Sequence, residues 1–248
     1  MIAIVLLSAA LAVANPPRSS PDSTPATTDA IIARYYSGIG GRDSLLADTT
    51  IRMAGSYQEG DFKATGTMVW RRFPLARRVA VTGPDGFPYI EIFDSKHTWE
   101  FSERFHKPAQ LDTGAAERAG RRGAEFDESF VDFASKGNRV ESRGRTTLDG
   151  HDVYQLHVTL ADGWEKDYYF DAATGLIFAM RKAMPLHAKG ADIESLSYFS
   201  DYRKAGHVLR PFLIDERNTK TGKLMNTVHW NTIDSNAPVQ TGAFVPPS

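Results

Sequence analysis

The side chains most able to do chemistry in this sequence are its seven histidines. They lie at positions 97, 106, 151, 157, 187, 207 and 229. No two have the i, i+4 spacing that places paired metal ligands on one helix face, and no Gly-x-Ser-x-Gly segment presents a nucleophile. We therefore predict no catalytic residue, no metal site and no cofactor. A hydrolase assembled from distant residues stays open as an alternative, because a nucleophile and its base need only meet in space.

A second candidate is the group Asp171, Thr174 and Gly175 in the segment YYFDAATGLIFAMRK. The flanking runs, residues 166–170 and 176–182, are typical of two neighbouring strands. Asp171 can accept hydrogen bonds from the amides that follow it, and Gly175 can adopt the positive φ that closes a loop. Turn chemistry accounts for all three residues, so we predict a β-hairpin turn here and not a reactive site.

Four arginines in the segment WRRFPLARR form a third candidate. Arg71, Arg72, Arg77 and Arg78 flank a predicted turn at Phe73-Pro74. They could bind lipid phosphates or an acidic partner. Basic residues at such positions more often solvate strand ends and discourage pairing between sheet edges. The sequence favours this second interpretation and leaves a functional role open.

Composition limits the classes of protein that this chain can be. Its 248 residues, 42% of them hydrophobic, are enough for one core and too few for several domains. The 29 basic and 30 acidic residues nearly cancel, so we do not expect nucleic acid as a partner. The absence of cysteine excludes a disulfide framework, a thiolate zinc site and a cysteine nucleophile, and it also excludes a lipid anchor on an N-terminal cysteine.

The N-terminal 28 residues differ from the rest of the chain. Residues 1–14 combine a short apolar run with the spacing Ala12-x-Ala14, which predicts a signal peptide cleaved before Asn15. Residues 15–28 are rich in Pro, Ser and Thr and predict a disordered leader. Residues 29–248 then form a single domain.

The elements of that domain follow from hydrophobic periodicity. A helix is predicted from Asp29, with Ile32, Tyr35 and Ile39 on one face and a glycine stop at positions 40 and 41. Residues 42–49 predict a short second helical turn. From Ile51 onward, apolar and polar residues alternate in segments such as FKATGTMVW and DVYQLHVTL, as in strands with one dry face.

Turn signals separate these strands and indicate antiparallel hairpins. They lie at residues 60–61, 85–86, 149–150, 162–163 and 219–222. Residues 114–137 show no alternation, and Phe126, Phe130 and Phe133 recur there at helical spacing, which predicts a helical interruption. The predicted fold class is therefore α+β, a strongly curved antiparallel sheet of about ten strands with helices covering its apolar face.

Five segments, taken in order, resemble a known family. They are IIARYYSGIGGRDSLL followed by TTIRMAGSY, then YYFDAATGLIFAM, FSDYRKAGHVLRPFLI and the closing NTIDSNAPVQTGAFVPP. This order is similar to that of the LolA/LolB-like periplasmic proteins, the outer-membrane lipoprotein-sorting family, from about Asp29 to the C-terminus. The resemblance implies an unclosed half-barrel with helices as a lid over a hydrophobic cavity for acyl chains, and no catalytic residues. Because the chain has no lipidated cysteine, it implies a soluble periplasmic form.

Taken together, these expectations describe a periplasmic carrier or binding protein for a lipophilic ligand. The expected partner is a lipid or acylated ligand, with envelope membrane proteins as further partners, and the expected state is a monomer. Aromatic and aliphatic residues placed on the dry face by strand parity are the predicted ligand-binding residues. They are Met68, Trp70, Val79, Val81, Trp99, Phe101, Leu156, Val158, Tyr168, Phe170 and Phe178.

Two alternatives to that site remain. Each of these side chains could simply pack in the core, because buried aromatic residues usually pack against one another. The protein could then be a non-catalytic accessory module that scaffolds an envelope complex. A cavity filled by the protein's own side chains would favour that alternative.

Overall fold

The structure is a computed structural model that describes residues 26–185 and 191–247. The predicted signal peptide, residues 1–14, and most of the predicted leader, residues 15–28, lie outside the described residues. Within the described ranges, no helix is long and apolar enough to cross a membrane.

The described residues form three α-helices, a 3-10 turn and 13 strands. The helices are α1 (Thr28–Ile39), α2 (Arg42–Leu46) and α3 (Gly114–Gly123), and the 3-10 turn is η1 (Glu103–Phe105). The first six strands are β1 (Thr50–Glu59), β2 (Phe62–Arg71), β3 (Ala76–Thr82), β4 (Pro88–Phe93), β5 (Thr98–Ser102) and β6 (Gln110–Leu111). The other seven are β7 (Arg139–Leu148), β8 (His151–Thr159), β9 (Glu165–Asp171), β10 (Ile177–Pro185), β11 (Asp192–Ala205), β12 (Val208–Asn218) and β13 (Leu224–Ser235).

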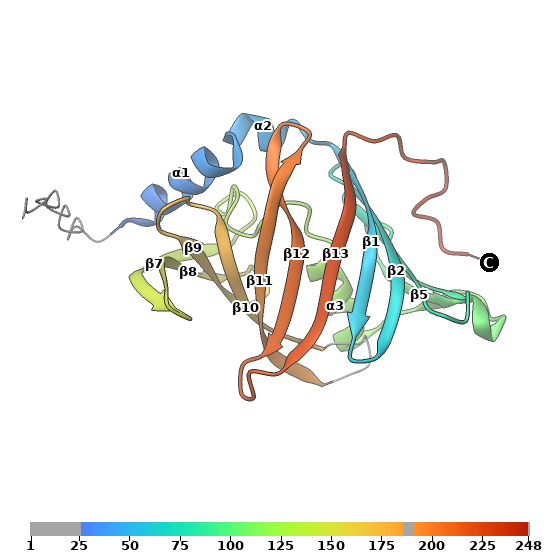
Figure 1. The fold of residues 1–248 in the computed structure, drawn as a ribbon. Coiled ribbons are helices and arrows are strands. Elements are labelled where there is room, and N and C mark those ends of the chain that lie inside the picture. The colour runs from blue at the N-terminus through green and yellow to red at the C-terminus, as the bar shows by residue number, and fades with distance from the viewer. Residues whose placement is uncertain (1–25, 186–190, 248) are drawn as a thin grey trace, which may run out of the picture.

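All 13 strands belong to one antiparallel sheet in the order β6-β5-β4-β3-β2-β1-β13-β12-β11-β10-β9-β8-β7 (Figure 1). The chain starts in the middle at β1, runs to the β6 edge, crosses through α3 to the β7 edge and returns to the middle. The predicted number of about ten strands is wrong. The prediction is too low for two reasons. Strand β6 has only two residues, and the turns after β4 and β11 contain no Asp-Gly or Gly-Asp dipeptide of the kind that marks other turns.

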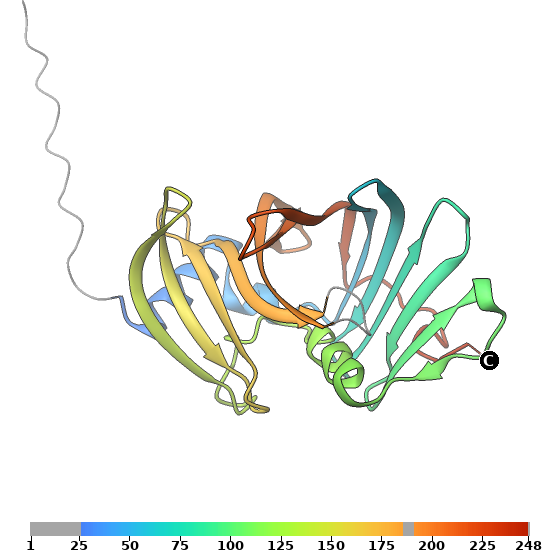
Figure 2. The same cartoon turned by 90° about the horizontal axis from the view of Figure 1, so that it is seen from below.

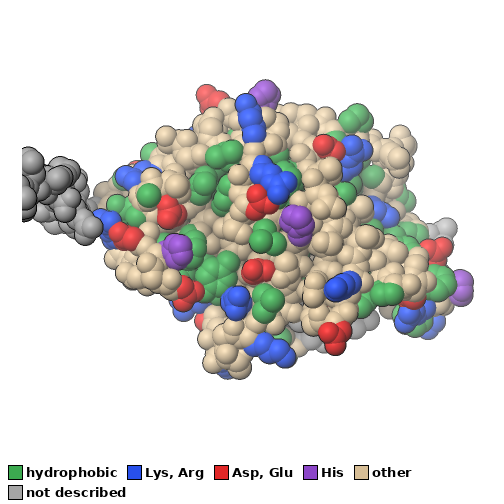
Figure 3. Space-filling model, in the orientation of Figure 1, with side chains coloured by type: hydrophobic (Ala, Val, Ile, Leu, Met, Phe, Trp, Pro, Cys, Tyr) green, Lys and Arg blue, Asp and Glu red, His purple; other side chains and the backbone are tan. Residues whose placement is uncertain are grey.

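The sheet curls without closing. Figure 2 shows it from below as a trough whose two sides are β1–β6 and β7–β10, with α3 lying between them. Helix α1 packs over β7, β8 and β12 at one end of the trough. On the outer, convex face, Figure 3 shows hydrophobic side chains interspersed with charged residues and histidines. The inside of the trough is therefore where a ligand site is best sought.

Helix α1 fills one part of the concave face. Its N-cap is Thr27, whose side chain accepts a hydrogen bond from the Ala30 amide, and Gly40 ends it in the left-handed conformation at φ 109°. Beneath it, Phe130 is fully buried and packs edge-on against Tyr35, with ring centroids 5.0 Å apart. The predicted helix at this position is confirmed, and its apolar face closes this part of the trough.

The predicted helical interruption at residues 114–137 is only partly helical. Helix α3 ends at Gly123, and Phe126, Phe130 and Phe133 lie in successive turns. Side-chain donors bind the backbone carbonyl groups that would accept hydrogen bonds within a helix. Lys136 Nζ donates to the carbonyl oxygens of residues 127 and 128 at 3.3 and 3.0 Å, and Asn138 Nδ2 donates to that of residue 129 at 2.9 Å. The phenylalanine spacing therefore reflects packing onto the sheet and not helix periodicity.

The predicted hairpin turn at residues 171–175 is present. Asp171 Oδ1 accepts hydrogen bonds from the Thr174 amide and hydroxyl, both at 2.8 Å, and Gly175 has φ 76°. The turn also docks on α1, because Arg34 Nη2 donates to the carbonyl of Ala172 at 2.6 Å. A Cβ added at Gly175 would lie 2.5 Å from the carbonyl oxygen of Arg34. The glycine is thus required by the turn and by the helix above it.

Gly175→Ala should separate these two requirements. Gly163 supplies the matched control, because it has φ 82° and no atom within 4 Å of an added Cβ. We expect Gly163→Ala to cost about 1–2 kcal/mol through the left-handed backbone alone. Gly175→Ala should cost about 1 kcal/mol more, because α1 must also shift. Urea unfolding of both variants measures the difference. Equal losses would show that the α1 contact adds nothing.

Arg72 holds the α2 region, the sheet and the 124–137 turns together. Its Nε donates to the carbonyl of Asp48 at 2.8 Å, its Nη2 donates to that of Leu45 at 3.1 Å, and its guanidinium forms a two-point ion pair with Asp127. The guanidinium carbon of Arg72 also lies over the Phe126 ring, 4.5 Å from the ring centroid. For Arg72, the interpretation as a residue that merely solvates a strand end is therefore wrong.

Asp48 forms a second buried junction, between α2 and β1. Its side chain is fully buried and accepts hydrogen bonds from Arg210 Nη2 at 2.6 Å and from Ser235 Oγ at 3.0 Å. Arg210 belongs to β12 and Ser235 ends β13. One carboxylate thus joins the start of the sheet's first strand to its last two strands.

Candidate ligand-binding cavity

The concave face is built by alternate residues of neighbouring strands. Met68 of β2 pairs with Met53 of β1 and with Val79 of β3, and Val79 pairs with Glu91 of β4. Because residues directly opposite each other on neighbouring strands lie on one face, these residues point to the same side of the sheet. Two adjoining hollows open along this face, and we call them the inner cavity and the outer cavity.

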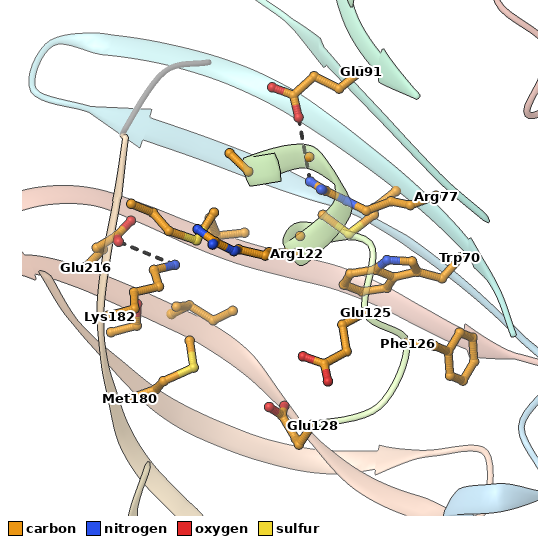
Figure 4. Close-up of a pocket in the computed structure, with 18 of the residues that line it drawn as sticks. Trp70, Arg77, Glu91, Arg122, Glu125, Phe126, Glu128, Met180, Lys182 and Glu216 are labelled. Atoms are coloured by element: carbon orange, nitrogen blue, oxygen red, sulfur yellow. Dashed lines mark ion pairs between the residues drawn. The ribbon is translucent and has the colours of Figure 1, made fainter. Parts of the chain in front are cut away.

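The inner cavity, of about 490 Å³, lies beneath α3 and the residues that follow it. Its floor includes Met68, Trp70, Met180, Phe199 and Trp230, which come from β2, β10, β11 and β13. Figure 4 shows side chains from these elements converging below α3. Its volume lies within the range of about 300–1,000 Å³ typical of small-molecule sites.

Glycines allow α3 to lie close over this cavity. A Cβ added at Gly120 would lie 2.2 Å from Thr98 Cγ2 on β5, and one at Gly123 would lie 2.5 Å from Arg77 Nη1 on β3. Thr98 also donates to the carbonyl of Glu117 at 3.3 Å. Helix α3 is thus fitted to β3 and β5 by residues without side chains.

The outer cavity, of about 920 Å³, lies along β1–β5 toward the β1–β2 and β3–β4 turns. Val79, Val81 and Tyr89 line it. Its rim carries Phe62, Phe87 and Phe105, which are among the exposed large apolar side chains. The two cavities share Met68, Glu91, Val228 and Trp230, so they adjoin along this wall.

Charged side chains also enter the inner cavity, mostly as ion pairs. Lys182 Nζ lies 3.5 Å from Glu216, and Arg77 Nη2 lies 3.8 Å from Glu91 (Figure 4). Lys166 Nζ lies 3.1 Å from a carboxylate oxygen of residue 125. The inner cavity is therefore amphiphilic. The outer cavity is lined mainly by aliphatic and aromatic groups, together with the charged residues Glu59, Asp85, Glu91 and Arg104.

Burial changes the acid–base behaviour of this wall. Burial raises the pKa of Glu128, and the nearby Lys166 opposes that rise. Burial lowers the pKa of Arg77, and the nearby Glu91 partly restores it. Both directions have the same cause, because loss of solvent disfavours the charged form of each group.

Several buried N–H donors on the inner wall lack partners. Among the described residues, Trp70 Nε1, Arg77 Nε, Arg210 Nε and Trp230 Nε1 make no hydrogen bond. All four side chains line the inner cavity. A buried donor without an acceptor is costly, so this wall is suited to a ligand that brings acceptor oxygen atoms.

The structure divides the predicted binding residues into three groups. Met68, Trp70, Val79 and Val81 line the two cavities. Leu156, Val158, Tyr168 and Phe170 are also on the concave face, but α1 and Phe130 cover them and each is at most 1% exposed. Trp99, Phe101 and Phe178 lie on the convex face. Contact between any of these residues and a ligand stays a prediction.

Strand parity placed the third group on the wrong face for two physical reasons. Thr98 and Ser102 of β5 line the cavities, so the alternate residues Trp99 and Phe101 point outward, where the C-terminal segment covers them with Phe244. Apolar residues are therefore needed on both faces there. In β10, a bulge between residues 177 and 179 turns Phe178 toward the convex face, where it contacts Tyr198.

The charged cavity residues were missed, although the sequence carried a signal for them. Arg77 is two residues from Val79, and Lys166 is two residues from Tyr168, so parity places each on the predicted dry face. The interpretation of Arg77 as a solvating residue at a strand end is wrong, because its side chain is 16% exposed and lines the inner cavity.

An unclosed antiparallel sheet, curled around an interior cavity beneath a helix, defines the class of open half-barrels with an internal cavity. Comparison with solved structures identifies this half-barrel more closely: the chain has a LolA-like fold. No protein-family model matches the sequence, and no curated protein sequence matches it.

Three similar solved structures support the fold assignment. A DUF1329 family protein from Desulfovibrio piger superposes with a TM-score of 0.60 at 11% identity, covering 88% of this chain and 96% of that one. A putative outer membrane lipoprotein-sorting protein domain from Vibrio parahaemolyticus gives 0.58 at 11% identity, covering 88% and 96%. A LolA superfamily protein from Nitrosomonas europaea gives 0.57 at 12% identity, covering 88% and 97%. At these identities the likeness shows the fold.

Proposed function

We propose that this protein is a carrier or binding protein for a lipophilic ligand in the cell envelope, and that it acts in the periplasm without a catalytic step. The observation that carries the proposal is the hollow part of the concave face, where the inner and outer cavities adjoin between apolar strand residues. A half-barrel that only scaffolded other proteins would have no need of this space.

Two further observations support the proposal. One of the similar structures is described as a putative outer membrane lipoprotein-sorting protein domain, and this description supports the proposal of a lipophilic ligand. The predicted signal peptide at residues 1–14 agrees with a place in the envelope. The accessory-module alternative predicts a concave face filled by the protein's own side chains. The part beneath α1 is filled in this way, whereas the inner and outer cavities are hollow.

Added bulk tests the proposal, because it acts differently in a cavity and in a filled core. We expect Val79→Trp, in the outer cavity wall, to keep the melting temperature close to that of the wild type and to weaken binding of a fluorescent fatty-acyl probe at least tenfold. Val158→Trp is the matched control, because Val158 is fully buried beneath α1. It should destabilise the fold by about 1–3 kcal/mol through overpacking.

Binding titrations and thermal melts of both variants check these expectations. If the wild-type protein binds neither the probe nor any component of a lipid extract, the accessory-module alternative should replace the carrier proposal. If Val79→Trp destabilises the protein as much as Val158→Trp does, the outer cavity is ordinary core.

A further inference from the structure

Arg77 is the least satisfied cation of the inner cavity. The other four basic side chains on the wall each have a carboxylate oxygen within 3.5 Å: Arg122 at 2.8 Å, Lys166 at 3.1 Å, Lys182 at 3.5 Å and Arg210 at 2.6 Å. Arg77 lies 3.8 Å from Glu91, beyond hydrogen-bond distance. Among the described residues, its Nε has no partner. This guanidinium therefore has unused capacity for an anion.

Two other acidic groups on the inner wall are already bound to other cations. Glu216 is held by Lys182 and by Ser195, whose hydroxyl donates at 2.6 Å. Asp127 forms its ion pair with Arg72. Glu91, on the strand next to Arg77, is the acid that competes for the guanidinium. A second acceptor near Arg77 would meet a buried, poorly hydrated cation, and burial already lowers its pKa.

Arg77 also stands where the polar and apolar parts of the site meet. Val79, two residues further along the same face of β3, lines the outer cavity. Glu91 and Met68 border both cavities. A chain lying in the outer cavity along Val79 and Val81 would therefore bring a group at its inner end to Arg77, close to the unpartnered indole N–H of Trp70.

We propose that Arg77 binds the acidic head group of an amphiphile whose acyl chain lies in the outer cavity. The inference rests on the proposed function and deepens it by naming the head group, a carboxylate or a phosphate monoester, and its inward orientation. A guanidinium offers these anions a planar pair of N–H donors, which an alcohol or a neutral ester cannot use as fully.

Calorimetric titration of the full chain tests the head-group preference. The ligands are dodecanoate, dodecyl phosphate and dodecanol, which share one chain, together with acetate and inorganic phosphate, which have none. We expect the two acidic amphiphiles to bind at least tenfold more tightly than dodecanol, because hydrogen bonds to charged partners are the stronger ones. Acetate and inorganic phosphate should bind far more weakly than the amphiphiles.

Four variants locate the preference. Arg77→Gln should remove it, bringing dodecanoate to the affinity of dodecanol, and Arg77→Lys should keep part of it. Arg78→Gln is the matched control, because Arg78 is the next residue of β3 and lines neither cavity. Glu91→Gln should tighten dodecanoate binding severalfold, because it removes the competing carboxylate. Circular dichroism melts establish that each titrated variant is folded.

The results separate the head-group inference from the carrier proposal. If dodecanol binds as tightly as dodecanoate, or if the preference survives in Arg77→Gln, the inference is overturned and the carrier proposal stands. If inorganic phosphate binds as tightly as dodecyl phosphate, the site takes free anions and the inference is again overturned. If dodecanoate, dodecyl phosphate and dodecanol all fail to bind, both the head-group inference and the carrier proposal are overturned.

Discussion

Phe130→Ala should destabilise the protein by about 3–5 kcal/mol, the range for truncating a fully buried phenylalanine. Phe130 has no exposed surface, and its ring packs edge-on at 5.0 Å from Tyr35, 4.9 Å from Tyr168 and 5.2 Å from Phe170. Such aromatic pairs add to the free energy of burial. Because the residue comes from the 124–137 turns, its loss should loosen those turns as well as α1.

Urea unfolding measures the loss, and Phe105→Ala is the control because Phe105 is 64% exposed. We expect the control to change stability by less than about 0.5 kcal/mol. Phe130 lines neither the inner nor the outer cavity, so folded Phe130→Ala should still bind the fluorescent acyl probe. Loss of probe binding while the variant is folded would place the ligand under α1.

Asp48→Ala should destabilise the protein by a similar amount, about 3–5 kcal/mol, because it leaves Arg210 as a buried cation without its carboxylate. Two further hydrogen bonds are lost with it, from Ser235 Oγ at 3.0 Å and from Asn236 Nδ2 at 3.5 Å. The substitution therefore weakens the junction of α2, β1, β12 and β13 all at once.

A double variant shows whether the buried charge is the cause. Asp48→Ala with Arg210→Met should be more stable than Asp48→Ala alone, because no unpaired cation remains. Asp43→Ala is the control, since the Asp43 side chain is fully exposed, and its stability should stay close to that of the wild type. If the double variant is less stable than the single one, loss of packing and not the unpaired charge dominates.

Local chemistry in the sequence was sufficient for part of this fold. The glycine stop after α1, the Asp171–Gly175 turn and the alternation of β2 and β8 each follow from a few neighbouring residues, and each is present. The ordered set of segments also predicted a LolA-like half-barrel, and the similar solved structures bear that out.

Other features depended on contacts between distant residues. Which aromatic residues face the cavity depends on what covers the convex face, and Phe244, more than 140 residues after Trp99 and Phe101, decides it for β5. Which part of the concave face is hollow depends on α1 and Phe130, which fill the space over Leu156 and Val158. No short-range sequence pattern carries this information. Strand parity therefore predicted many of the residues on the concave face, but it could not predict which part of that face is hollow.

The position of β1 beside β13 has a consequence for how the protein is assembled. In this ladder, residues far apart in the chain are paired, such as Met53 with Ile233, which are 180 positions apart. Every other ladder of the described sheet joins strands adjacent in the chain. Hairpin contacts can form early and locally, but a ladder of such long range must first overcome the entropy of closing a large loop. The two sides of the trough can therefore fold as separate meanders before they meet. The wall shared by the cavities takes Met68 from one meander and Val228 from the other, so this wall is complete only when β1 has paired with β13.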